Sequence, residues 1–377
     1  MGGGSPFDFE TPLEHASDLV GRERELAELA HLTRSGTYTL VRAPRRYGKT
    51  SLLKAAGELW REDEQGLAVH VDFSEILTIE EAARRVRVAY EQQGDQGHAR
   101  RILSEALRSV RVRLGPVEIG PLASPSAVLD HAAGLHELLE LPVEVARRSD
   151  RRAVVYFDEF QDVLAVQGLD GLLRSHIQHH RANVTYVFAG SEPSMLRELF
   201  SDRSRPLYGQ AHPFRLGRIS PEALHEHLTS RFKETGKDAG EAGAEIVLLG
   251  AGHPQRTILL AWHLWELTSE GTPASRADAS EALTATLKAR GPELDAMLRA
   301  MTANERRVAI AIAHGLAPTG ARAQRSTGIA TRSAAQQSLR ALLERGDLER
   351  SDSGQISLVD PLLAAHLRRR HRLRDNP

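Results

Sequence analysis

Cysteine is absent from the 377 residues of this sequence, which excludes disulfide bonds and thiolate metal sites and fits a reducing compartment. No apolar run approaches the ~18 residues that a membrane-spanning helix requires. Residues 1–6 contain neither the basic nor the apolar region of a signal peptide. From these absences we expect a soluble, cytoplasmic protein with no membrane partner.

Net charge is also nearly absent, because 49 Lys+Arg residues are balanced by 50 Asp+Glu residues and the formal charge is −1. No global field therefore draws the chain toward nucleic acid or membranes. The charge is unevenly distributed, however, since residues 295–377 contain 14 arginines, no lysine and eight acidic residues, a net charge of +6. With 41% hydrophobic residues, the chain is long enough for two or three domains.

Residues 39–53 read TLVRAPRRYGKTSLL, in which a β-type apolar run, a turn-rich loop and an apolar helix follow one another. This order, with Gly-Lys-Thr closing the loop, is typical of a phosphate-binding loop. Gly48 would let the backbone approach a phosphate, and the loop N–H groups would converge on the anion with the helix N-terminus. Lys49 would reach the β- and γ-phosphates, and the Thr50 hydroxyl would ligate Mg²⁺. The pattern predicts a nucleoside triphosphate site.

The first glycine of the usual G-x-x-x-x-G-K-[ST] pattern is Ala43 here. Alanine preserves such a loop provided that its φ angle stays negative. No guanine-reading [NT]-K-x-D motif is visible, which favours ATP over GTP. We assign nucleotide contacts to the loop and the helix start: Ala43, Pro44, Arg45, Arg46, Tyr47, Gly48, Lys49, Thr50 and Ser51.

A second motif lies in residues 154–161, VVYFDEFQ, where an apolar run suited to a buried parallel strand ends in two carboxylates. Asp158 would hold Mg²⁺ through its water shell, and Glu159 would orient or deprotonate the attacking water. An isolated Asp-Glu pair could instead be a helix cap and a surface acid. Because a Gly-Lys-Thr loop precedes it, we favour the catalytic interpretation.

Other segments carry weaker signals. Residues 67–73 predict a strand and residues 79–92 a charged helix, while an amphipathic helix begins in residues 18–26. The period-two alternation over residues 110–120 predicts a hairpin, which would touch DNA or serve as a packing ribbon with a solvated basic face. The polar helix expected over residues 170–181 includes His176, His179 and His180; with no carboxylate partner in view, we favour a solvated face over a metal site.

Three runs together are characteristic: LVGRERELAEL (19–29), RAPRRYGKTSLL (42–53) and VVYFDEFQDV (154–163). They resemble the archaeal-type ATPases, a branch of P-loop proteins near the origin-recognition and STAND groups of the AAA+ class. The resemblance implies an α/β fold with a five-stranded parallel sheet, an all-α lid and a C-terminal winged helix. We place the ATPase core in residues 1–219, the lid in 220–291 and the winged-helix domain in 292–377.

The same resemblance implies further site residues. Gly21 and Arg22 would pack on the adenine. Ser191, after the strand 184–189, resembles sensor 1, although a helix cap explains it equally. Arg205, or Arg203 in the same basic loop, would reach the γ-phosphate of a neighbour in an oligomer, unless it is one of many surface arginines. Pro254 resembles the Gly-x-Pro nucleotide contact of STAND proteins, although Gly-x-Pro also simply starts a helix, and Arg256 is a weaker candidate.

The C-terminal segment has a winged-helix pattern. Helices are expected over residues 303–314, 321–326 and 332–345, followed by a hairpin around the turn 352–354. The third helix would expose Arg332, Gln336, Gln337 and Arg340, side-chain types that read guanine and adenine edges in the major groove. Winged helices also dock proteins, and acidic residues lie close by, so both partners stay open.

We therefore expect an ATP-binding, Mg²⁺-dependent, ATP-hydrolysing protein whose nucleotide state is coupled to a winged helix that binds double-stranded DNA. The alternative is a STAND-like switch that signals or assembles through protein contacts. Either function implies a homo-oligomer or a protein partner.

Overall fold

The computed structural model describes residues 5–13, 15–93, 97–114, 125–351 and 353–372, which form two compact units. The sheet unit comprises residues 13–43 and 49–216. The helical unit comprises the residues up to Pro12, the loop Pro44–Gly48 and residues 217–377. In the described part of the chain, no helix combines the length and apolar character that a bilayer crossing requires.

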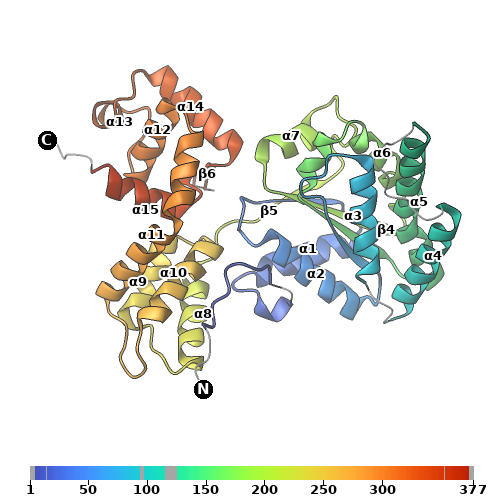
Figure 1. Cartoon of the computed structure of the whole chain (residues 1–377), viewed down its shortest axis with the longest axis horizontal. Coiled ribbons are helices and arrows are strands. Elements are labelled where there is room, and N and C mark those ends of the chain that lie inside the picture. The colour runs from blue at the N-terminus through green and yellow to red at the C-terminus, as the bar shows by residue number, and fades with distance from the viewer. Residues whose placement is uncertain (1–4, 14, 94–96, 115–124, 352, 373–377) are drawn as a thin grey trace. The chain divides into compact units, whose positions relative to one another are not determined.

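The sheet unit is built on five parallel strands in the order β2-β3-β4-β1-β5 (Figure 1). The inner strands β3 and β4 are buried along their whole length, which is the environment that suits their Val- and aromatic-rich sequences. The strands are β1 (Thr39–Arg42), β2 (Ala68–Asp72), β3 (Ala153–Asp158), β4 (Val184–Gly190) and β5 (His212–Arg215). The five-stranded parallel sheet expected from the sequence is confirmed.

Helices connect the strands and cover both faces of the sheet (Figure 1). The α-helices of the unit are α1 (Glu23–Arg34), α2 (Lys49–Asp63), α3 (Ile79–Glu91), α4 (His98–Leu114), α5 (Pro125–Ser149), α6 (Leu169–Ile177) and α7 (Pro193–Ser201). Two 3-10 turns, η1 (Ala16–Asp18) and η2 (Phe160–Ala165), complete it. The amphipathic helix that we expected to begin in residues 18–26 is α1, and it begins at Glu23.

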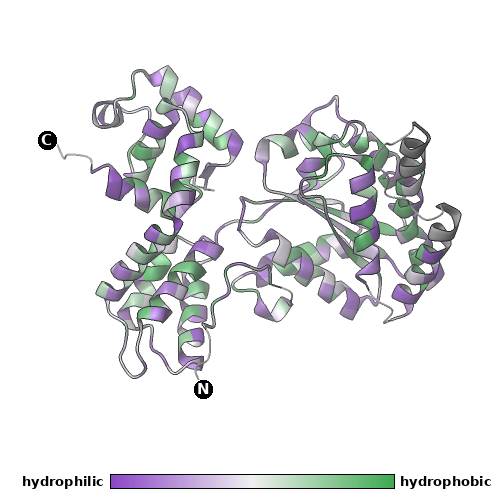
Figure 2. Ribbon diagram, in the orientation of Figure 1, coloured by the Kyte–Doolittle hydropathy of each residue, from purple (hydrophilic) through white to green (hydrophobic). Residues whose placement is uncertain are grey.

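Successive side chains of β3 point to opposite faces of the sheet. The Tyr156 ring lies against α2, since a Cβ added at Gly57 would be 3.4 Å from it. Phe157 points the other way and stacks on Phe73 at 5.1 Å between ring centroids, within the core that α3 and α5 cover. Figure 2 shows the strands as predominantly hydrophobic and the outer faces of the helices as hydrophilic. Burial of this apolar surface stabilises the sheet. The carboxyl ends of the strands are the positions at which such sheets bind ligands.

The hairpin predicted over residues 110–120 is wrong in its first half, because α4 continues through Leu114. The second half, residues 115–120, lies outside the described residues. A short run that alternates apolar residues with arginines fits the amphipathic surface of a helix as well as a strand, and here the longer helical period that begins at His98 prevails.

The helical unit contains two sets of helices and a small antiparallel ribbon, around one continuous apolar core. The first set is α8 (Pro221–Glu234), α9 (Gly240–Gly250), α10 (Pro254–Leu267) and α11 (Arg276–Ala300). The second set, with the ribbon, is α12 (Ala303–Ala313), α13 (Ala321–Thr327), α14 (Arg332–Arg345), β6 (Leu348–Arg350), β7 (Ile356–Leu358) and α15 (Pro361–Arg370).

The helices and wing strands expected at the C-terminus all form, and α14 has the predicted bounds. Thr331 caps α14 by accepting a hydrogen bond from the Ala334 N–H, and Gly346 ends it in the left-handed conformation, with φ 81°. Ser220 caps α8 in the same way, with Pro221 at the first helical position. The helix α11 runs continuously across the predicted boundary between residues 291 and 292.

A buried ion-pair network joins the two sets of helices. Arg256 of α10 is only 1% exposed, and its guanidinium donates to Asp360 Oδ2 at 2.6 and 2.9 Å and to Glu293 Oε1 at 2.8 Å. Through its other oxygen, Asp360 caps α15 by accepting from the Leu362 N–H at 2.8 Å. Arg256, the weaker candidate for a nucleotide contact, is therefore held by two carboxylates of its own unit.

Asp360→Asn is expected to lower the free energy of unfolding by ~1–3 kcal/mol, because the side-chain amide would turn an N–H group toward the buried Arg256 guanidinium. The measurement is urea unfolding followed by circular dichroism. Glu241→Gln, which removes an exposed ion pair with Arg276, is the matched control and should leave the midpoint unchanged. Equal midpoints for all three proteins would show that the network contributes nothing to stability.

Candidate functional site

The carboxyl ends of the parallel strands meet at one edge of the sheet, where open α/β folds place their ligands. The strand order puts β4 between β1, which leads into the Gly-Lys-Thr loop, and β3, which ends at Asp158. Ser191 directly follows β4. The topology therefore brings three motifs that are far apart in the sequence to neighbouring positions at this edge.

The two nucleotide motifs are in direct contact within the sheet unit. Thr50 Oγ1 donates to Asp158 Oδ2 at 2.5 Å, and Lys49 Nζ donates to Glu159 Oε1 at 3.3 Å. Lys49 is only 5% exposed, so a cation lies almost buried beside a carboxylate at the first turn of α2. The structure thus brings the four predicted residues of the two motifs together. They are the phosphate-binding lysine, the two Mg²⁺ ligands and the catalytic glutamate.

Glu159 is held through both carboxylate oxygens. While Oε1 accepts from Lys49, Oε2 accepts from Ser191 Oγ at 2.8 Å and from Gln161 Nε2 at 2.6 Å. The backbone of Glu159 has φ 45°, a left-handed conformation that is unusual for a residue other than glycine and often marks functional sites. Gln161 belongs to the sequence motif, but the sequence assigned it no function. The structure shows that it donates a hydrogen bond to Glu159.

Asp158 is a buried carboxylate with a strongly acidic pKa. Burial alone would raise its pKa, but the nearby His70, the Lys49 charge and the Thr50 hydroxyl lower it to about 2. His70 Nε2 lies 3.5 Å from Asp158 Oδ2, and no local sequence signal pointed to it. Asp158 is therefore ionised throughout the neutral pH range, as a ligand of a hard cation must be.

This donor set fits ATP with Mg²⁺. Mg²⁺ prefers oxygen ligands, and the Thr50 hydroxyl and the Asp158 carboxylate supply them side by side. A nearly buried ammonium group at Lys49, next to a helix N-terminus, suits the phosphate oxygens. Thr50 and Asp158 are the residues that would hold the metal ion, and Lys49 the one that would hold the phosphates.

Three arginines add positive charge at the same edge of the sheet. Arg42 and Arg215 end the paired strands β1 and β5 in register, and Arg197 lies on α7. Burial lowers the pKa of Arg42, and the neighbouring charges of Arg197 and Arg215 lower it further. Sequence reasoning missed this group, because the pairing of β1 with β5 creates it.

The loop residues Pro44–Gly48 are grouped with the helical unit, where Arg46 Nη1 donates to Glu293 Oε1 at 2.5 Å and Tyr47 Oη donates to Glu349 Oε1 at 2.9 Å. Gly48 has φ 82°, a conformation that explains the glycine at this position. Ala43 is not among the described residues with positive φ, which meets the condition for replacing the usual glycine.

The other predicted nucleotide contacts have these surroundings. Gly21 has φ 59° and precedes Arg22, which is 3% exposed and pairs with Glu25 at 2.7 Å. Ser51 Oγ accepts from the Leu13 N–H at 3.0 Å, so this hydroxyl anchors the N-terminal segment of the sheet unit. Pro254 is the first residue of α10 in the helical unit.

Arg205 of the predicted finger loop pairs with Asp170 at 3.4 Å and with Glu198, and both partners belong to the same unit. A role at a neighbouring subunit requires Arg205 to leave these carboxylates.

The predicted recognition residues Arg332, Gln336, Gln337 and Arg340 are all exposed along α14, whereas Leu342 is buried. The three arginines at the end of α15, in contrast, make hydrogen bonds within their unit. Arg368 donates to the Ala313 carbonyl, Arg369 to Thr284 and Arg370 to Asp295. The predicted recognition residues are therefore exposed on α14, while Arg368, Arg369 and Arg370 of α15 are engaged in contacts of their own unit.

The three histidines near α6 do not form a simple solvated face, because Glu140 of α5 is the carboxylate partner that the sequence did not reveal. His176 and His180 both contact it, whereas His179 is exposed and contacts Gln178. Burial lowers the pKa of His180, although Glu140 opposes the shift. The prediction failed because Glu140 is 36 residues from His176 in sequence.

No family model and no curated protein matches this sequence. Solved structures do match it. The Walker-type ATPase PABY2304 of Pyrococcus abyssi aligns with a TM-score of 0.69 at 20% identity, over 95% of this chain and 99% of that chain. The ORC2 protein of Aeropyrum pernix, in its ADPNP–ADP complexes, aligns with a TM-score of 0.56 at 17% identity, over 93% of this chain and 92% of that chain.

These likenesses extend over nearly the whole chain, and at such identities they establish the fold. They agree with the expected architecture of a five-stranded parallel sheet flanked by helices and a C-terminal winged helix. The chain therefore shares the fold of the Walker-type ATPase of Pyrococcus abyssi and of the ORC2 protein of Aeropyrum pernix.

Proposed function

We propose that this chain binds ATP with Mg²⁺ and hydrolyses it at the carboxyl edge of its parallel sheet. The observation that carries the proposal is the contact of Lys49 with Glu159 and of Thr50 with Asp158, where Asp158 ends β3 and Glu159 follows it. The chain is similar in fold to a protein described as a Walker-type ATPase and to one solved with ADPNP and ADP, which supports the same chemistry.

Each residue of the constellation has a distinct role. Mg²⁺, when bound, would neutralise charge on the phosphate oxygens. Lys49 would leave Glu159 to contact the phosphates, which frees one carboxylate oxygen to orient or deprotonate water. Ser191 and Gln161 would keep the other oxygen in place. Asp158 would stay ionised and hold the metal through its water shell.

The test is ATP turnover by the full chain, measured at steady state with and without Mg²⁺ and with and without duplex DNA. Turnover that requires Mg²⁺ is the expected result. Absence of Mg²⁺-dependent turnover, both with and without duplex DNA, would overturn the proposed hydrolysis.

The second part of the proposed function is that the nucleotide state is coupled to the winged helix and that α14 binds double-stranded DNA. Its support is the row of exposed Arg and Gln side chains on α14, in a segment with a net charge of +6 over residues 295–377. Arg205 would act on the nucleotide of a neighbouring copy, which implies a homo-oligomer.

Replacing both Arg332 and Arg340 by alanine is expected to weaken duplex binding by about tenfold or more at low salt. The slope of log K against log[salt] should become shallower by ~1–2, because two phosphate- or base-contacting cations are lost. The measurement is fluorescence anisotropy of a labelled duplex with the full chain. The double variant Arg276→Ala and Arg299→Ala removes the same charge from exposed positions of α11 and should bind like the wild type.

A protein-docking switch of the STAND type is the alternative, and one observation favours it. Acidic residues surround the end of α14, where Arg345 is already paired with Asp347 at 2.6 Å and with Glu305 at 3.4 Å. In that case the full chain would assemble with ATP, as measured by sedimentation, and would show no salt-dependent affinity for duplex DNA.

A further inference from the structure

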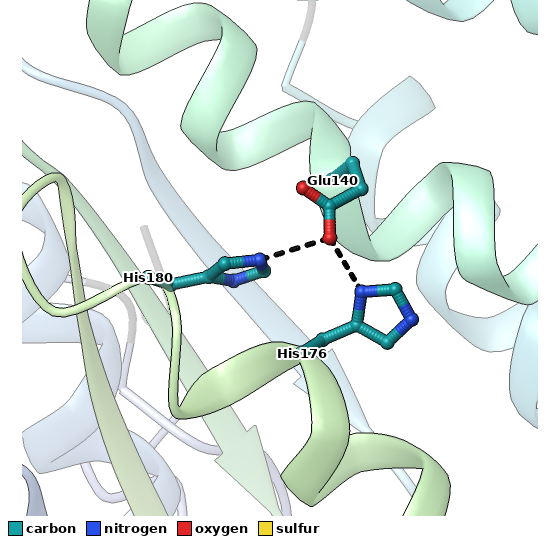
Figure 3. Close-up of side chains that lie close together, drawn as sticks. All are labelled: Glu140, His176 and His180. Atoms are coloured by element: carbon teal, nitrogen blue, oxygen red, sulfur yellow. Dashed lines mark hydrogen bonds and ion pairs between the residues drawn. The ribbon is translucent and has the colours of Figure 1, made fainter.

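A second polar cluster lies in the sheet unit, where two histidine rings converge on one carboxylate (Figure 3). Glu140 comes from α5, His176 from α6, and His180 from the turn between α6 and β4. His176 Nδ1 is 2.5 Å and His180 Nε2 3.0 Å from the same oxygen, Glu140 Oε1. The potential ligand atoms all lie within 4.8 Å of one another.

Both rings are fixed by contacts of their other nitrogen. His180 is 2% exposed, and its Nδ1 is 2.8 Å from the Tyr186 hydroxyl of β4. His176 Nε2 is 2.5 Å from His136 Nδ1, one turn before Glu140 on α5. Partners of this kind orient the histidines of metal sites, in which the outer nitrogen carries the ring proton. The inner nitrogens donate to the Glu140 carboxylate here, and a metal ion would displace those protons. The cluster is therefore preorganised by residues that a metal ion would not touch.

We propose that Glu140, His176 and His180 bind Zn²⁺ and thereby cross-link α5 to the α6–β4 turn. Two imidazole nitrogens and one carboxylate oxygen are a ligand set that zinc accepts, with a water molecule at the fourth position. Bonds of ~2.0–2.1 Å in a tetrahedral site require ligand atoms ~3.3 Å apart. Since the inner nitrogens already face the carboxylate, small side-chain rotations would open that space.

The position of the cluster separates it from the proposed nucleotide site. His180 lies in the turn that leads into β4, which begins at Val184, so the cluster lies at the amino end of this strand. Ser191 and Glu159 lie at the carboxyl end of the sheet. We therefore assign the zinc ion a stabilising role and none in ATP hydrolysis. It would act on the packing of α5, whose Leu135, Leu138 and Leu139 belong to the core.

The experiment is a calorimetric titration of Zn²⁺ into the full chain, prepared without a histidine tag and stripped of metal with a chelator. We expect saturable binding of one Zn²⁺ per chain and a rise in melting temperature with zinc concentration. Glu140→Gln and His176→Ala should each weaken binding at least tenfold, because each removes one ligand. Glu140 is 54% exposed at its side chain, so this variant should fold normally, which circular dichroism will check.

His179→Ala is the matched control, since this neighbouring histidine is exposed and lies outside the cluster. Its zinc affinity should equal that of the wild type. Co²⁺ provides an independent readout, because a tetrahedral site gives visible absorption that should disappear in His176→Ala. Absence of saturable zinc binding in the wild type, or equal affinity in wild type and His176→Ala, would refute the proposal and leave the cluster as two histidines hydrogen-bonded to one glutamate.

Discussion

Glu159→Gln is expected to lower kcat for ATP hydrolysis by ~10²–10⁴-fold, the range that a general base typically contributes. Glutamine keeps the size of the side chain and can still accept from Ser191, but it cannot take a proton from water. ATP binding should persist, because Lys49 and Thr50 are unchanged. The measurement is steady-state phosphate release, combined with equilibrium binding of ATP to the same preparation.

Glu62→Gln is the matched control, since it replaces an exposed carboxylate at the far end of α2. It should turn over ATP like the wild type. If Glu159→Gln and the wild type hydrolyse ATP at the same rate, Glu159 is not the base and the catalytic assignment fails, even where ATP binding is intact.

Lys49→Met is expected to weaken ATP binding by about 100-fold or more, which corresponds to ~2.7 kcal/mol. The ammonium group is nearly buried and lies next to the carboxylates of β3, so a phosphate that approaches without it would meet uncompensated negative charge. Methionine preserves the aliphatic length of the side chain. Isothermal titration with a slowly hydrolysed ATP analogue in the presence of Mg²⁺ measures the loss.

The control is Lys288→Met, which removes an exposed lysine from α11 and should leave the affinity unchanged. Comparable affinities for wild type and Lys49→Met would show that ATP does not bind at Lys49. The two substitutions also separate binding from catalysis, since Lys49→Met should weaken ATP binding whereas Glu159→Gln should slow turnover and leave binding intact.

Sequence reasoning succeeded where a signal is contained within a few consecutive residues. The strand before the Gly-Lys-Thr loop, the apolar run that ends at Asp158 and the capped helix from Arg332 to Arg345 were all predicted, because propensity, apolar period and caps agree there. It failed at residues 110–114, where a short alternating run is compatible with two periods and the helix that began at His98 simply continues.

The site divides in the same way. Lys49, Thr50, Asp158 and Glu159 are recognisable from their local motifs, whereas Gln161 and His70 acquired a role only from the structure. Arg256 shows the limit most clearly, because its partner Asp360 lies 104 residues away. A sequence motif identifies the chemical groups that a site can use, but not the groups that orient them from other elements.

The amino-acid sequence by itself determined the phosphate-binding loop, the acidic strand end, the parallel-sheet class and the winged-helix pattern, since each depends on local conformation and on hydrophobic period. Tertiary structure alone decided that Ser191 and Gln161 share the Glu159 carboxylate and that Glu140 meets His176 and His180. The physical reason is that these contacts depend on strand order and helix packing, which unite residues that no local interaction connects.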